Sequence, residues 1–152
     1  MLSVLIIVLD QVTKYFASQA LMLHQAIPVF PGFNLTLMHN TGAAFSFLSQ
    51  AGGWQRWFFI VLASTISIAI LIWMHGLSAN RRWLLAALAF VLGGALGNLW
   101  DRVMIGHVVD FIEVYYENYY FPAFNIADSA ITIGAIMLII DALWFNDTEI
   151  EH

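Results

Sequence analysis

The sequence predicts an all-α membrane protein with four transmembrane helices and a small outward-facing β element between the first two. Its 152 residues are 61% hydrophobic and only 10% charged, with a mean hydropathy of +0.80. Soluble domains carry about 45–50% apolar and about 25% charged residues, so a soluble fold is excluded. The apolar stretches are also long enough to cross a bilayer. We therefore expect one integral membrane domain over residues 1–152, with spans at about 1–20, 57–74, 83–103 and 126–145.

Composition excludes several classes of function. The formal net charge is -5 and no basic run occurs, so nucleic acid is not an expected partner. Cysteine is absent, which rules out disulfides, thiolate metal sites and cysteine nucleophiles. The five histidines are scattered without the close spacing of a helical zinc site, so we expect neither a metal nor a cofactor.

The first predicted helix is apolar up to Leu9 and then becomes polar. Asp10 and Lys14 stand four positions apart, on one helix face, with the acid first, which is the favourable order for an ion pair. A cleaved leader is not expected, because the stretch lacks a basic start and a small-residue cleavage site. This predicts a transmembrane helix with a charged pair in its second half.

Residues 24–53 do not resemble a span. Phe33, Leu35 and Leu37 alternate with more polar residues, which is the period-2 pattern of a half-buried strand. Pro31-Gly32 predicts a turn before this strand, and residues 40–42 a break after it. Residues 43–48 are apolar again. We expect a small sheet-like element at the membrane surface.

The second and third spans enclose the loop that predicts the orientation. Residues 57–74 carry no charge, and the following loop holds Arg81 and Arg82, the chain's adjacent cations. By the positive-inside rule this loop is cytoplasmic, which makes both termini cytoplasmic and turns residues 24–53 outward. In the third span, Gly93 and Gly97 form a small-xxx-small pair that permits close helix contact.

Residues 104–124 return to the outside and are rich in tyrosine and phenylalanine, so we expect an amphipathic aromatic loop there. Its residues 113–124, together with the outer β element, are expected to cover the polar residues at the outer ends of the helices. Asn125 then opens the last span. Asp141, near the inner end of that span, is expected to be solvated at the interface.

Charged and amide residues gather at the predicted outer ends of the helices. They are Asp10, Lys14, Asn98, Asp101, Arg102, Asn125 and Asp128, with Asn40 from the outer loop and Asp110 between the last two spans. Buried charges need partners, and Asp101 and Arg102 are expected to serve a structural salt-bridge network. Two cations against four aspartates leave two carboxylates without a counter-charge. Two such carboxylates held close would share a proton, which is the condition for aspartic-protease chemistry.

The expected pair is Asp110 and Asp128. Asn125-x-x-Asp128 has the spacing of a capping box, which sets Asp128 at a helix N-terminus where the helix dipole favours its ionised form. Asp128 is therefore the expected general base and Asp110 the expected acid.

Other functions also fit some of these residues. A Ser/Lys protease would use Lys14 to activate Ser46 or Ser129. A proton- or ion-coupled transporter would use the intramembrane carboxylates as a relay, although the charges gather at one interface and no repeat is visible. A non-enzymatic membrane scaffold is the third alternative.

The motifs resemble those of bacterial lipoprotein signal peptidase (signal peptidase II). In order, they are Asp10-Gln-Val-Thr-Lys14, Asn40-Thr-Gly-Ala-Ala-Phe45, Gly93-Gly-Ala-Leu-Gly-Asn98-Leu-Trp-Asp101-Arg102, Val108-Val-Asp110-Phe-Ile112 and Phe124-Asn-Ile-Ala-Asp128-Ser129. The resemblance extends from about Val8 to Ala142. Nine residues precede Asp10, fewer than is usual in that family, so we expect a truncated or mis-assigned start that affects the anchoring of the first helix and not catalysis.

The resemblance implies an aspartic endopeptidase of the bacterial inner membrane, with its active site near the outer leaflet. Such enzymes remove signal peptides from diacylglyceryl-modified prolipoproteins, before the lipidated cysteine, and are blocked by the cyclic peptide globomycin. It also implies a monomer surrounded by membrane lipid. The catalytic pair falls on Asp110 and Asp128. The positions that line or support the site are Asp10, Lys14, Asn40, Gly42, Asn98, Asp101, Arg102, Asn125 and Ala127.

Overall fold

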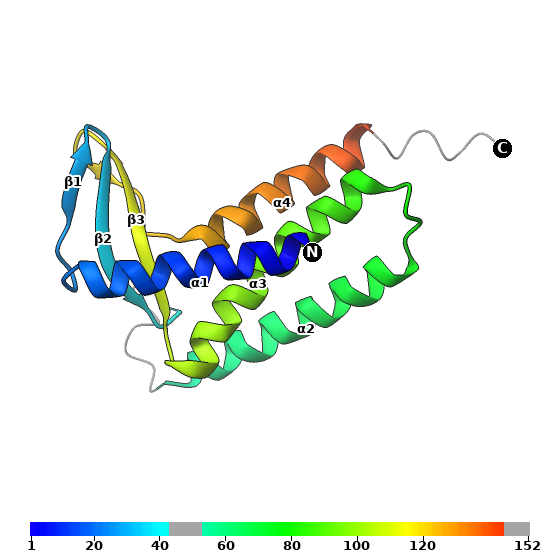
Figure 1. Cartoon of the computed structure of the whole chain (residues 1–152), viewed down its shortest axis with the longest axis horizontal. Coiled ribbons are helices and arrows are strands. Elements are labelled where there is room, and N and C mark those ends of the chain that lie inside the picture. The colour runs from blue at the N-terminus through cyan, green and yellow to red at the C-terminus, as the bar shows by residue number, and fades with distance from the viewer. Residues whose placement is uncertain (43–52, 145–152) are drawn as a thin grey trace.

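A computed structural model describes residues 1–42 and 53–144 of the chain. It has a bundle of long helices with a small antiparallel sheet at one end (Figure 1). The start of α1 and the end of α4 lie away from the sheet (Figure 1). The helices are α1 (Leu2–Ala20), α2 (Trp54–Gly76), α3 (Arg82–Met104) and α4 (Ile126–Trp144). The strands are β1 (Ile27–Phe30), β2 (Phe33–Asn40), β3 (Val108–Tyr116) and β4 (Tyr119–Tyr120).

The helices agree with the predicted spans to within a few residues. Within the described ranges, α2, α3 and α4 are each long and apolar enough to cross a membrane. α1 does not belong to this group although it has 19 residues, because its second half carries Asp10 and Lys14. Its charged face is instead buried against other helices, as described below.

α3 is the central helix and packs against α1, α2 and α4. Its glycines permit this close packing, as the small-xxx-small pair predicts. A Cβ on Gly93 would come within 2.9 Å of Ile6 on α1, and one on Gly97 within 2.7 Å of the Asp10 carboxylate. Gly94 faces α4, and a Cβ there would contact the backbone oxygen of Ala127. These contacts bring the polar ends of α1, α3 and α4 together.

The sheet confirms the β element predicted between the first two helices and extends it. Its strand order is β1-β2-β3-β4, with antiparallel pairing throughout the described residues. Met38 pairs with Asp110 and Asn40 with Val108, after an irregularity in the register between Leu35 and Met38. The end of β2 is thereby aligned with the start of β3.

The prediction of an aromatic loop between the last two helices is wrong, because most of this segment forms strands. Residues 108–120 form β3 and β4, joined by a tight turn in which Glu117 has a φ of 53°. β-branched and aromatic residues such as Val108, Val109 and Ile112 favour strands, and β2 supplies a pairing partner. Asp110 is consequently held on a strand. The apolar segment 43–48 of the sequence analysis lies outside the described residues.

Polar contacts also join the helices at the end of the bundle away from the sheet. Arg81 forms an ion pair with Asp141 at 3.2 Å, and the Trp83 indole donates to the backbone oxygen of Met137. Asp141 is only 6% exposed, so the expectation of a solvated carboxylate is wrong. Arg81, 60 positions earlier in the chain, supplies the counter-charge that makes its burial tolerable.

Candidate active site

A buried lysine connects two aspartates where α1 meets α3. The Lys14 ammonium lies 2.8 Å from Asp10 and 2.8 Å from Asp101, and these side chains are at most 5% exposed. It also donates to the Asn98 side-chain oxygen at 2.9 Å. An ammonium group has three N–H donors, so each one has an acceptor here.

The two aspartates of this cluster hold the elements that carry the expected pair. The Asp10 carboxylate accepts from the backbone N–H of Ala127 at 2.9 Å, at the start of α4. The Asp101 carboxylate accepts from the backbone N–H of Val109 at 3.3 Å, on β3. Ala127 and Val109 immediately precede Asp128 and Asp110. The cluster therefore sets where both carboxylates lie.

Asn98 connects this cluster to Asp128. Its oxygen accepts from Lys14, so its amide nitrogen must face the other way, and it donates to the Asp128 carboxylate at 2.7 Å. The same oxygen accepts from the Asn125 side chain at 3.2 Å. The orientation of the Asn98 amide thus follows from the position of the lysine.

Asn125 bridges the two candidate catalytic carboxylates. Its side-chain amide donates to Asp110 at 2.7 Å, and its backbone N–H donates to Asp128 at 3.3 Å. The backbone N–H of Asp128 donates in return to the Asn125 side-chain oxygen at 2.9 Å. This is the reciprocal pattern of the capping box that the sequence predicts. Asp128 is therefore at once a helix cap and a neighbour of Asp110.

Asp110 is 2% exposed and accepts from two amides, Asn125 and Asn40, the latter at 3.0 Å. Asn40 is itself held by the backbone N–H of Gly42. Burial, and next the negative charge of Asp128, raise the pKa of Asp110 to about 7, against the opposing effect of the two amide donors and Lys14. Asp110 can therefore hold a proton near neutral pH.

The prediction that Arg102 forms a salt-bridge network with Asp101 is wrong, because Asp101 pairs with Lys14 instead. In the described part of the chain, no carboxylate lies within 4.0 Å of the Arg102 guanidinium. It stacks over the ring of Phe59 on α2, with 4.9 Å between Cζ and the ring centroid. Gly42 packs on the same ring and has a φ of +100°, so a side chain there is excluded.

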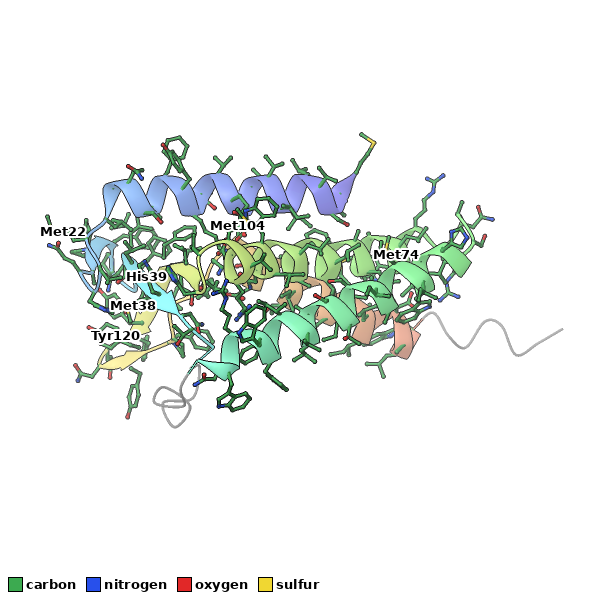
Figure 2. The ribbon with its side chains drawn as sticks, turned by 90° about the horizontal axis from the view of Figure 1, so that it is seen from below. Met22, Met38, His39, Met74, Met104 and Tyr120 are labelled. Atoms are coloured by element: carbon green, nitrogen blue, oxygen red, sulfur yellow. The ribbon has the colours of Figure 1, made fainter. Side chains whose placement is uncertain are left out.

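Cavities reach the two carboxylates from different sides. Asp128 lines one of 370 Å³ with Phe121, Phe124, Ser129, Thr132 and Ile133. It also lines one of 280 Å³ between α2, α3 and α4, together with Asn98 and Arg102. Asp110 lines a third, of 230 Å³, with the end of β2 and residues 122–123. In Figure 2, Met38 and His39, which line this third cavity, lie at the sheet end of the molecule, while Met74 lies toward the opposite end.

Two polar residues of this region were missed by the sequence analysis. Gln11 donates to Asp101 at 2.8 Å and to Asp10 at 3.2 Å, so it helps to order the cluster. Arg56 on α2 donates to the backbone oxygens of Arg102 and Val103, at 2.7 and 2.9 Å, at the end of α3. Gln11 adjoins Asp10 in sequence, which was the available signal. Nothing near Arg56 in the sequence points to α3.

The arrangement suits general acid–base chemistry. One carboxylate at a helix N-terminus and one buried carboxylate with a raised pKa share a neighbour in Asn125. Such a pair can deprotonate a water molecule and donate a proton to a carbonyl oxygen. In the parts of the chain described, no group of three or more His, Cys, Asp or Glu side chains converges as metal ligands would.

Comparisons with known proteins indicate a peptidase. The family model of signal peptidase (SPase) II matches residues 2–144. The chain is 58% identical over 145 residues to a lipoprotein signal peptidase of Acinetobacter baumannii, covering 95% of this chain and 82% of that protein. It is 55% identical over 142 residues to a lipoprotein signal peptidase of Pseudomonas aeruginosa, and this match covers 92% of this chain and 84% of that protein.

Two solved structures also match. Each is a bacterial membrane enzyme determined by the in meso method, at 1.9 and 2.3 Å resolution. The first has a TM-score of 0.83 at 37% sequence identity, and the match covers 94% of this chain and 90% of the chain in that structure. The second has a TM-score of 0.85 at 35% sequence identity, and the match covers 99% of this chain and 91% of the chain in that structure.

Proposed function

Because the chain belongs to the signal peptidase II family, we propose that it removes the signal peptides of diacylglyceryl-modified prolipoproteins as an intramembrane aspartic endopeptidase. Cleavage occurs before the lipidated cysteine. Asp110 and Asp128 are the catalytic pair, and neither a metal nor a cofactor takes part. Globomycin is expected to inhibit the enzyme by occupying this pair.

In the proposed mechanism, Asp128 is the general base and Asp110 the general acid. Asp128 accepts a proton from the water that attacks the scissile carbonyl, and protonated Asp110 donates to the carbonyl oxygen. The raised pKa of Asp110 supports this division, as does the position of Asp128 at the start of α4. Protons of a coupled pair belong to both groups, so the pair titrates as a unit.

The single observation that carries this proposal is the bridge through Asn125. It holds two carboxylates together, and neither forms an ion pair within the described residues. The other three aspartates of those residues each have a cation. Asp10 and Asp101 are paired with Lys14, and Asp141 with Arg81. Carboxylates left without a cation in an apolar setting are costly and mark functional sites.

The proposed orientation turns the sheet and the candidate site toward the outer leaflet of the bacterial inner membrane, with both termini cytoplasmic. The lipid anchor of the substrate then stays in the bilayer while its peptide reaches the site from the side. The cavity that Asp128 lines between α2, α3 and α4, and the one that it lines with residues 121 and 124, support such a lateral approach. The aromatic hairpin of β3 and β4 would cover the site during catalysis, and we expect the enzyme to act as a monomer.

The test is cleavage of a diacylglyceryl-modified prolipoprotein in detergent by Asp110→Asn and Asp128→Asn. Each variant should lose about 10²–10⁴-fold in kcat, the usual contribution of a general acid or base. Asp141→Asn is the matched control, because it removes a buried carboxylate at the other end of the bundle and should retain kcat. Cleavage at the wild-type rate by either dyad variant would falsify the proposal.

The Ser/Lys alternative finds less support. All three donors of Lys14 are engaged, and the Ser129 hydroxyl donates to the backbone oxygen of Asn125 at 3.0 Å. Ser46 lies outside the described residues. Ser129→Ala is expected to keep cleaving, and a complete loss in that variant would favour the serine mechanism.

A further inference from the structure

We propose that Arg102 binds the carboxylate that cleavage creates at the C-terminus of the signal peptide, so that the released peptide competes with new substrate. The inference rests on the proposed function, since it concerns the product of that reaction. It assigns to Arg102 a ligand that does not exist before the peptide bond is cut.

The first observation is an arginine with unused hydrogen-bonding capacity. Within residues 1–42 and 53–144, its guanidinium has one acceptor, the backbone oxygen of Asn98 at 3.4 Å, and no carboxylate within 4.0 Å. Its Nε is buried and has no hydrogen-bond partner. A guanidinium carries five N–H donors in a planar fork. A guanidinium with unused donors beside an apolar groove is stabilised by any hydrogen-bond acceptor that enters the groove.

The second observation is the shape and chemistry of that groove. The 280 Å³ cavity between α2, α3 and α4 is polar where Asn98, Arg102 and Asp128 meet. The rest of its lining is apolar, from Phe59, Leu62, Ala63, Ile66, Val91, Ala95 and Ile131. A signal peptide has an apolar stretch of about 7–15 residues that ends near its cleavage site. With that stretch along the groove, its cleaved end lies at the polar side, near the arginine.

Hydrolysis changes the charge at this end. The oxygen of water bonds to the scissile carbon, the C–N bond breaks, and the products are a carboxylate and a protonated amine. Before the reaction Arg102 meets a neutral amide. Afterwards it meets a carboxylate, which a guanidinium binds through two parallel charge-assisted hydrogen bonds. This attraction offsets the repulsion between the new carboxylate and Asp128, which lines the same cavity.

The inference is tested with two synthetic signal peptides that end at the residue before the cysteine, one with a free carboxylate and one with a carboxamide. We expect the carboxylate peptide to inhibit wild-type cleavage about tenfold more strongly than the carboxamide, since hydrogen bonds to charged groups contribute more than neutral ones. In Arg102→Gln the two peptides should inhibit equally. Arg102→Lys keeps the charge but loses the fork, and should retain about a threefold preference.

Equal inhibition of the wild type by the two peptides would overturn the inference, and this comparison needs no variant to fold. A preference that persists in Arg102→Gln would overturn it as well. The assay is repeated in micelles containing phosphatidylglycerol. A preference that disappears there assigns Arg102 to a lipid phosphate and contradicts product binding, whereas an unchanged preference supports it.

The outcome is separable from that of the proposed function. Direct binding of both peptides to Asp110→Asn should show the same tenfold preference, although this variant is expected not to cleave. If Asp110→Asn cleaves normally, the catalytic pair is wrong while the peptide preference still reports on Arg102. If it fails to cleave but binds both peptides equally, only the product site is wrong.

Discussion

At the scale of single residues, the site depends on amide side chains that orient carboxylates. Asn98 is turned by Lys14 and so donates to Asp128, while Asn125 and Asn40 donate to Asp110. An amide can direct a hydrogen bond without adding a charge of its own. The amides therefore hold the candidate pair in place without adding charge to it.

The pKa of Asp110 predicts the alkaline side of the activity profile. An ordinary aspartic acid loses its proton near pH 3.8, but burial and Asp128 raise the pKa of Asp110 to about 7. The acid is thus present below about pH 7 and lost above it, so kcat/KM should fall about tenfold per pH unit on the alkaline side. Initial rates between about pH 5 and 9 check this.

Asn40→Ala supplies the internal comparison for this prediction. Asn40 donates to the ionised form of Asp110 and so lowers its pKa. Removing that donor should move the alkaline limb to higher pH, and a shift to lower pH would contradict the assignment.

The folded protein binds the proton of Asp110 more tightly than the unfolded chain. Asp110 therefore contributes stability that is complete below about pH 3.8 and is lost as the pH rises through about 7.

Lys14 is predicted to be essential for stability because two buried carboxylates share it. Lys14→Met would leave Asp10 and Asp101 without their counter-charge, at a cost of about 3–5 kcal/mol. Thermal unfolding in detergent should show this loss. Adding Asp101→Asn to Lys14→Met removes one of the stranded charges and should recover part of the stability. Strictly additive losses would show that the two residues do not interact.

At the scale of elements, the catalytic geometry depends on how closely α3 approaches α1 and α4. The glycines of α3 give this approach, and the cluster of Asp10, Lys14 and Asp101 then fixes the start of α4 and of β3. Arg56 holds the last turn of α3 to α2. A displacement of one helix would therefore move one carboxylate relative to the other.

Gly94→Ala tests this close packing. Its Cβ would contact the backbone oxygen of Ala127 and lie 2.7 Å from Ile131, so α3 and α4 must separate. Overpacking of this kind costs about 1–3 kcal/mol. Because Ala127 precedes Asp128, kcat should fall together with the melting temperature. The matched control is Gly76→Ala at the end of α2, where a Cβ meets nothing within 4 Å and both quantities should remain near wild type.

The local features of this site were predictable from the sequence, and the distant ones were not. The Asp10–Lys14 pair and the box of Asn125 and Asp128 depend on spacings of four and three residues, which a helix start or helix face determines by itself. β3 is a strand because β2, some 70 positions earlier, pairs with it. Its own sequence, with Asp110 among apolar and aromatic residues, lacks a clean alternation. The pairing of Asp141 with Arg81 and the stacking of Arg102 on Phe59 likewise depend on helices distant in the chain.

At the scale of the whole molecule, the polar network of the site lies at the sheet side of the bundle, and apolar helix surface dominates the rest. α2 is the extreme case among the described helices, since only 11% of its most apolar stretch is buried within the protein. Such a surface requires lipid around it. The orientation of this asymmetric molecule in the membrane is the remaining prediction.

The absence of native cysteine makes that orientation simple to measure. Single cysteines are introduced as Ala79→Cys, in the exposed α2–α3 loop, and Asn118→Cys, in the exposed turn between β3 and β4. In intact spheroplasts a membrane-impermeant maleimide should label only the Asn118 position. After lysis both positions should react equally. Labelling of the Ala79 position in intact cells would reverse the proposed orientation.

The burial of the α1 charges against α3 has a consequence for the order of synthesis. α1 is synthesised before α3, yet on its own it would expose Asp10 and Lys14 to lipid, because the other acceptors of Lys14 stand on Asn98 and Asp101. Those residues are translated more than 80 positions later. We therefore expect α1 to reach its final place in the membrane only after α3 has been made. Stable insertion of α1 would thus depend on a helix that is synthesised later.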